Sequence, residues 1–114
     1  MLFRSAEAVL VRAIEPAFGT PWMRQNRPVK KPHELTSGPA KLCLALELRR
    51  EFDGVDLCSE DSDLIIAENP DAKKVRRVSG PMTTTTRIGL SVAGHLPLRF
   101  YLDGSKFVSR RAST

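Results

Sequence analysis

The most informative stretch of the chain reads Ser37-Gly38-Pro39-Ala40-Lys41-Leu42-Cys43-Leu44-Ala45-Leu46. Ser37 is a suitable N-terminal cap, Pro39 has the φ angle of a first helical turn, and the apolar spacing predicts a helix from Pro39 to about residue 50. Gly38 lets the backbone approach a ligand, and Lys41 lies where a cation opposes the helix dipole. Backbone N–H groups beside a lysine suit a phosphate, although an ordinary capped helix with a solvated lysine explains the same residues.

The segments on either side of this helix predict an α+β fold. A β-branched run at 8–14 predicts a strand ending at Glu15-Pro16, and Thr20-Pro21 predicts a short helix over 20–27. Further strands are expected at 64–67, 75–78, 83–92 and 98–102, and Asp103-Gly104 predicts a hairpin turn into 106–108. The sequence therefore predicts a single domain, 1–114, with a largely antiparallel sheet or partial barrel, a few short helices and a frayed tail at 109–114.

Length and charge narrow the class of protein. The 114 residues fit one domain, since domains run to ~100–200 residues. Residues 1–50 have a net charge of +5, residues 51–72 a net charge of −8, and residues 73–114 a net charge of +8. The basic segments suit a polyanion bound through its phosphates. A contribution to solubility alone is the simpler explanation of the same positive charges.

Cysteine usage and hydropathy argue against several classes of protein. Cys43 and Cys58 form no CxxC pair and have no paired histidine nearby, which argues against a zinc site and against a disulfide framework. No apolar run approaches the ~20 residues of a membrane span. No secretory signal pattern opens the chain, so we expect a cytoplasmic protein without a membrane partner.

Several blocks in order carry a resemblance to a known family. They are Val9-Leu10-Val11-Arg12-Ala13-Ile14-Glu15-Pro16, Met23-Arg24-Gln25-Asn26-Arg27, Ser37 to Cys43, Thr86-Arg87-Ile88-Gly89, Pro97-Leu98-Arg99-Phe100-Tyr101, and Gly104-Ser105 with Phe107-Val108-Ser109. Between about Ala8 and Ser109, the chain resembles the C-terminal half of the alkyladenine, or 3-methyladenine, DNA glycosylases.

The resemblance implies a role in base-excision repair of DNA. Members hydrolyse the N-glycosidic bond of alkylated purines, and they flip the damaged nucleotide out of double-stranded DNA because its reacting carbon is unreachable in the stack. A water attacks that carbon with a glutamate as general base, and no metal or other cofactor is used. The resemblance also implies a monomer, associated with the nucleoid in a bacterium or located in the nucleus of a eukaryote.

Site residues follow from the same resemblance. Arg12 matches the arginine that helps hold the catalytic water and the glutamate, and Ile88 matches the position whose backbone carbonyl contacts that water. Leu10 and Gly89 fall at the substrate pocket. Lys41, Arg50 and Gly38 fall at the DNA-phosphate contacts. Arg12 stands out from the residues alone, because a charge inside an apolar strand needs a partner or a function, whereas a strand arginine with its head in water is the plain alternative.

The resemblance covers only part of the family sequence. Family members are nearly twice as long, and their N-terminal half carries the glutamate, in a Glu-Thr-Glu-Ala-Tyr-like segment, and the tyrosines that stack the base. Neither segment occurs in this sequence. The chain is therefore expected to be a fragment that lacks the family's N-terminal part. Two alternatives to a glycosylase stay open, a catalytically inactive DNA-binding remnant and a generic basic interaction domain.

Overall fold

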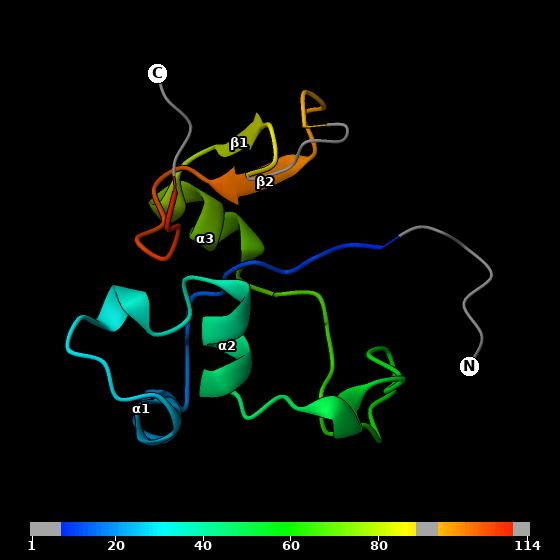
Figure 1. The fold of residues 1–114 in the computed structure, drawn as a ribbon. Helices are drawn as coiled ribbons and strands as arrows, with labels where there is room; N and C mark the ends of the chain where they lie inside the picture. The colour runs from blue at the N-terminus through cyan, green and yellow to red at the C-terminus, as the bar shows by residue number, and fades with distance from the viewer. Residues whose placement is uncertain (1–7, 89–93, 111–114) are drawn as a thin grey trace.

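The computed structural model describes residues 8–88 and 94–110 of the chain. Short helices lie mainly in the first two thirds of this part, and a small sheet lies in the last third (Figure 1). The elements in chain order are α1 (Thr20–Asn26), η1 (Pro32–Glu34), α2 (Pro39–Ala45), η2 (Arg50–Phe52), α3 (Ala72–Ser79), β1 (Met82–Thr85) and β2 (Arg99–Leu102). The predicted α+β class is confirmed.

The helices α1 and α2 pack against each other and form the core. Gly19 has the left-handed φ of 78° at the N-cap of α1, a conformation that glycine adopts without strain, and a proline follows in the first turn. Met23, Leu35 and Ala45 form the buried cluster. The Asn26 side-chain amide donates to the carbonyl of Ala45 at 2.8 Å, which satisfies an acceptor at the end of α2. The short helix predicted over 20–27 is thus confirmed.

The central helix differs from its prediction at both ends. Its N-cap is Gly38, without a side-chain cap bond, so the prediction that Ser37 caps the helix was wrong. The helix ends at Ala45 and not near residue 50, because Glu47 adopts a φ of 54°. The amides of Leu48 and Glu47 donate back to the carbonyls of Cys43 and Leu44, which closes the helix as a Schellman motif.

The sheet consists of β1 and β2, paired antiparallel with Met82 opposite Leu102 and Thr85 opposite Arg99. The strand predicted at 98–102 is confirmed by β2. The β-rich run 83–92 is a strand only as far as Thr85, and residues 89–93 of that run lie outside the described residues. Among the described residues the sheet has two antiparallel strands and forms no closed barrel, in agreement with the predicted antiparallel sheet.

Three predicted strands are absent from the described residues. Segment 64–67 is irregular, and Asp103-Gly104 makes a turn that leads into further turns at 106–108 instead of a hairpin strand. The predicted strand 75–78 lies within α3, where Lys and Arg, which favour helices, surround two valines on the i and i+3 positions.

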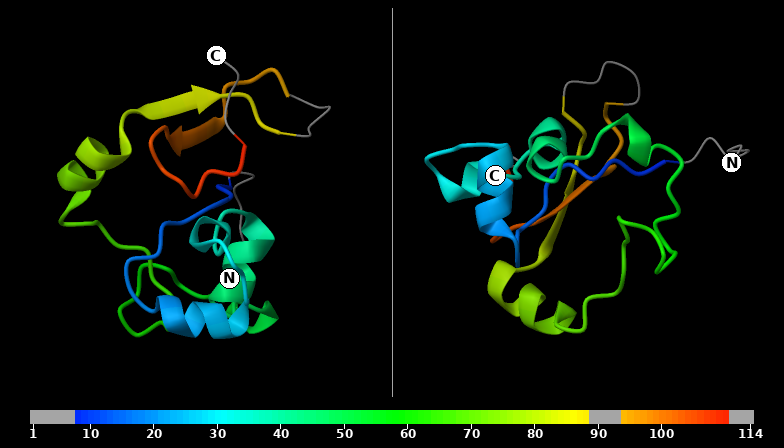
Figure 2. Two further views of the ribbon diagram at one scale, coloured as in Figure 1. Left: turned by 90° about the vertical axis from the view of Figure 1, so that its left-hand side faces the viewer. Right: turned by 90° about the horizontal axis from the view of Figure 1, so that it is seen from below.

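The segment 8–14 also forms no strand, although it runs as a stretched trace (Figure 1). Within the described part of the chain, its backbone is tied only at Ile14, whose amide donates to Thr36 at 3.2 Å and whose carbonyl accepts from the Thr36 hydroxyl at 2.6 Å. Figure 1 and the left view of Figure 2 show this segment passing between the helices α1 and α2 and the sheet. A β-branched run without a neighbouring strand has no ladder to join.

Burial in this fold is sparse. The buried apolar side chains of the described residues are Met23, Leu35, Leu42 and Ala45. The chain exposes 9628 Å², whereas about 6,200 Å² is expected of a folded monomer of its mass. Many large apolar side chains lie at the surface, and Val9 is 92% exposed.

Candidate functional site

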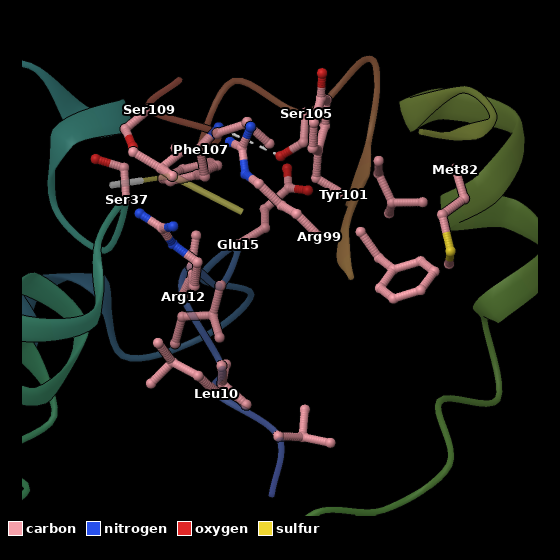
Figure 3. Close-up of a pocket in the computed structure, with 18 of the residues that line it drawn as sticks. Leu10, Arg12, Glu15, Ser37, Met82, Arg99, Tyr101, Ser105, Phe107 and Ser109 are labelled. Carbon is pink, nitrogen blue, oxygen red and sulfur yellow. Dashed lines mark hydrogen bonds between the residues drawn. The ribbon is translucent and has the colours of Figure 1, made fainter. Parts of the chain in front are cut away.

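A large cavity lies between the stretched segment 8–15 and the sheet (Figure 3). One wall is formed by residues 8–15, and the opposite wall by β2 and residues 105–109. Its volume is about 1050 Å³, at the upper end of the range for small-molecule sites, which hold ligands the size of a nucleotide. Segments distant in sequence thus meet around one hollow.

Three of the residues singled out in the sequence line this cavity. Leu10 and Arg12 come from the stretched segment, which lines the cavity along residues 8–15. Ile88 comes from the stretch after β1. Figure 3 shows the Arg12 guanidinium pointing toward Ser37 and Ser109, with Leu10 farther along the same wall. Gly89, expected at the same pocket, lies outside the described residues.

Arg99 is a fourth cavity residue, and it had no role assigned from the sequence. Its guanidinium lies 4.7 Å from the centroid of the Tyr101 ring and donates a hydrogen bond to the carbonyl of Arg110. Partial burial lowers the pKa of Arg99, the positive charges of Arg12 and Arg110 lower it further, and Tyr101 opposes the change. The alternation of Arg99 and Tyr101 on one side of β2 was the available signal.

The cavity is cationic. Arg12, Arg87 and Arg99 line it, and Glu15 is the one carboxylate among the described residues that does so. An anion entering this hollow meets guanidinium groups in a partly desolvated setting, where charge interactions exceed those in water. No group of three or more His, Cys, Asp or Glu in residues 8–88 and 94–110 is placed to hold a metal ion.

The cavity also has an apolar part. Leu10, Val75 of α3, Met82 and Phe100 line it, and Figure 3 shows Met82 on the opposite side of the hollow from Arg12. Phe100 is 59% exposed, so its ring is available to a flat ligand. A molecule with an aromatic part and an anionic part therefore matches the two ends of the hollow.

Of the three residues expected at DNA phosphates, Gly38 and Lys41 lie side by side at the start of α2, and Arg50 lies in a separate element. Lys41 lies in α2 behind Ser37, and its Nζ donates to the Ser37 hydroxyl at 3.5 Å. Gly38 has an extended φ of −164°, and a Cβ there would meet only the Lys41 side chain, at 3.4 Å. Arg50 lies exposed in η2, at the start of the acidic stretch and away from the cavity-lining residues.

The helix α3 presents a basic surface that the sequence interpretation missed. Its bases are all exposed, and they are Lys73, Lys74, Arg76 and Arg77. Val75, on the same helix, reaches the cavity wall. The predicted strand at 75–78 would have placed successive bases on opposite faces, whereas the helix gathers them on one face, opposite Val75. Within the described residues, the helices are too short and too polar for any of them to traverse a lipid bilayer.

Comparison with known proteins gives a consistent result. A family model described as methylpurine-DNA glycosylase matches residues 4–106. A protein of Methanoculleus marisnigri, provisionally named 3-methyladenine DNA glycosylase, is 40% identical over 94% of this chain and 54% of its own length. Proteins of the same provisional name from Francisella tularensis and Paraburkholderia phytofirmans are 38% and 42% identical, over 92% and 96% of this chain and 52% and 51% of theirs. The chain spans about half the length of the curated relatives it matches.

Proposed function

The chain belongs to the methylpurine-DNA glycosylase family, and we propose that it acts on double-stranded DNA in base-excision repair, by hydrolysing the N-glycosidic bond of alkylated purines. The observation that carries this proposal is the family match over residues 4–106. The provisional glycosylase names of relatives about 40% identical support it. A monomeric state and a cytoplasmic location are part of the same proposal.

The cavity is the proposed place of reaction. A purine in a duplex is stacked, so the nucleotide must leave the helix before its anomeric carbon is reachable. In this proposal the base lies in the apolar part of the cavity, against Leu10 and next to Gly89 of the sequence. The Ile88 carbonyl and the Arg12 guanidinium hold the attacking water. Arg12, Leu10 and Ile88 line one hollow, and this supports their assignment to one site.

The proton of the attacking water needs an acceptor. Arg12 cannot supply it, because a guanidinium stays protonated in proteins. Glu15, which is exposed, is the carboxylate that the described residues place at the cavity. Positioned general bases contribute about 10²–10⁴-fold to rate. We therefore expect the 114-residue polypeptide alone to release base more slowly than a full-length family member by a factor of about that size.

Single-turnover release of hypoxanthine or a methylated adenine from a labelled duplex tests the proposal. Arg12→Ala is expected to reduce release further, and Arg24→Ala, an exposed arginine of α1, serves as the matched control with unchanged release. Glu15→Gln tests whether Glu15 is the general base, since this variant changes the rate of purine release only if Glu15 accepts the proton of the attacking water. Equal release by wild-type and Arg12→Ala would refute the role of Arg12.

The absence of any release, together with saturable duplex binding, would favour the inactive DNA-binding alternative. A full-length relative assayed in parallel shows that the substrate is competent. Efficient release by the wild-type chain at the rate of that relative would show that the polypeptide contains its own general base, contrary to the expected loss of rate.

A further inference from the structure

One end of the cavity gathers hydrogen-bond donors from three separate segments. Arg12 comes from the stretched segment, Arg99 from β2, and Ser37 from the loop before α2. Figure 3 shows the head groups of both arginines directed toward this end, where Ser37 and Ser109 also lie. Guanidinium and hydroxyl groups converging on one space are the donors that bind oxyanions in proteins.

Arg99 is already held in position before any ligand enters. The Tyr101 ring, 4.7 Å from its guanidinium carbon, and the hydrogen bond to the Arg110 carbonyl fix the side chain. A guanidinium carries five N–H donors, and the Arg110 contact uses only one nitrogen. Most of the donors of Arg99 are therefore left for the cavity, and little side-chain entropy is lost when they bind.

Ser37 supplies a donor at the back of the same space. Only 5% of this residue is exposed, yet it lines the cavity. Its oxygen accepts from Lys41 at 3.5 Å, which leaves the hydroxyl proton available to a ligand. Lys41 thus adds positive charge behind the serine without itself lining the hollow.

Arg12 and Arg99 are like charges at the same end of the cavity, and this arrangement favours the binding of an anion between them. Burial and the charge of Arg12 both lower the pKa of Arg99, whereas Glu15 has no part in that shift. An oxyanion between the guanidinium groups would replace their repulsion with two attractive contacts. Donors that approach from three directions match a tetrahedral phosphate better than a planar carboxylate, which presents its oxygens in one plane.

We propose that Arg99, Arg12 and Ser37 form a phosphate-binding site at the Ser109 end of the cavity. This role of Arg99 and Ser37 goes beyond the water-holding role of Arg12 in base hydrolysis. The phosphate comes either from solution or from a phosphodiester of nucleic acid. The proposal is independent of base release, since a chain without glycosylase activity still has this site.

Titration of the full 114-residue chain with inorganic phosphate and, separately, with the dinucleotide dTpdT tests it by heteronuclear NMR at constant ionic strength. Saturable shifts are expected, with acetate as the carboxylate comparison producing none. Tighter binding of dTpdT identifies nucleic acid as the source, and tighter binding of inorganic phosphate identifies the free ion. No saturation with either ligand, or equal saturation with acetate, overturns the proposal.

Two variants and one chemical measurement localise the site. Arg99→Gln is expected to raise Kd roughly tenfold, the loss of a charge-assisted bond, and Arg77→Gln on α3 is the control with unchanged Kd. In the wild-type chain, phosphate should slow the modification of Arg99 by phenylglyoxal relative to that of Arg77, which requires no variant to fold. Unchanged phosphate affinity in Arg99→Gln, or equal protection of both arginines, would show that the ion binds elsewhere.

Discussion

Gly104 illustrates how a single residue sets the geometry of one cavity wall. A Cβ at this position would lie 2.7 Å from the carbonyl oxygen of Ser79, whose side chain is buried. The amide of Gly104 donates to that same carbonyl, so the turn after β2 rests directly on the end of α3. Only glycine permits this contact, because the Ser79 backbone leaves no room for a side chain.

Gly104→Ala is therefore expected to destabilise the contact between α3 and β2 by about 1–3 kcal/mol, the usual cost of overpacking. Gly38→Ala is the matched control, since its new Cβ would touch only the flexible Lys41 side chain, at 3.4 Å. Urea unfolding followed by far-ultraviolet circular dichroism measures both. Equal midpoints for the two variants would mean that the turn moves freely away from α3.

At the scale of elements, α3 has the most direct bearing on nucleic-acid binding. Four exposed bases on eight residues make it the densest positive surface in the described part of the chain. Each phosphate neutralised by a lysine or arginine contributes about −0.9 to the slope of log K against log salt concentration. Weak duplex binding with a steep salt dependence is the expected behaviour.

The double variant Lys73→Ala, Lys74→Ala should reduce the magnitude of that slope by about 1.8, if both side chains contact phosphates. Lys30→Ala, Lys31→Ala is the matched control, an exposed pair in the loop before α2. Fluorescence anisotropy of a labelled duplex at several salt concentrations gives the slopes. Binding that is indifferent to salt, or an effect of the control pair equal to that of the α3 pair, would contradict this assignment.

The elements that could be predicted from sequence are those decided by local residues. The helix α1 has its Thr20-Pro21 signal in its first turn, and β2 directly precedes the turn signal Asp103-Gly104. The stretched segment 8–14 could not be predicted correctly, because a strand depends on a partner and this segment has none among the described residues. The helix α3 was misread because two valines outweighed the surrounding helix-forming bases.

The candidate site also contains residues that local sequence identifies and residues that depend on contacts between distant segments. Arg12 was identifiable as a charge within an apolar run, and its neighbour in space, Ile88, was identified only through resemblance to the family. Arg99 was missed because its importance arises from the contacts with Tyr101 and Arg110 and from the proximity of Arg12. The spacing of Arg99 and Tyr101 was a local signal, whereas Arg110 and Arg12 belong to other segments, and neither composition nor spacing encodes their proximity to Arg99.

At the scale of the whole molecule, the ratio of buried to exposed apolar surface has the largest effect on folding stability. Few apolar side chains are buried, while Phe18, Phe100 and Leu10 are among those that lie largely at the surface. Apolar burial is the main favourable term in folding. A chain that buries this little has a small margin against its conformational entropy.

The isolated chain is accordingly expected to melt in a broad thermal transition at low temperature and to self-associate as its concentration rises. Differential scanning calorimetry and size-exclusion chromatography over a concentration series measure the two effects. A narrow transition at high temperature with a monomeric elution volume at every concentration would contradict the expectation.

The stretched segment that carries Arg12 has one further consequence, for the order in which proteases cut the chain. Proteases act on exposed backbone that is not held in regular structure, and residues 8–13 lack backbone hydrogen bonds within the described part of the chain. Trypsin, which selects a basic side chain, should therefore cut after Arg12 before it cuts after Arg24 in α1. The wall of the proposed catalytic cavity is then severed before α1 in a limited digest, and mass spectrometry of successive products would reveal this order.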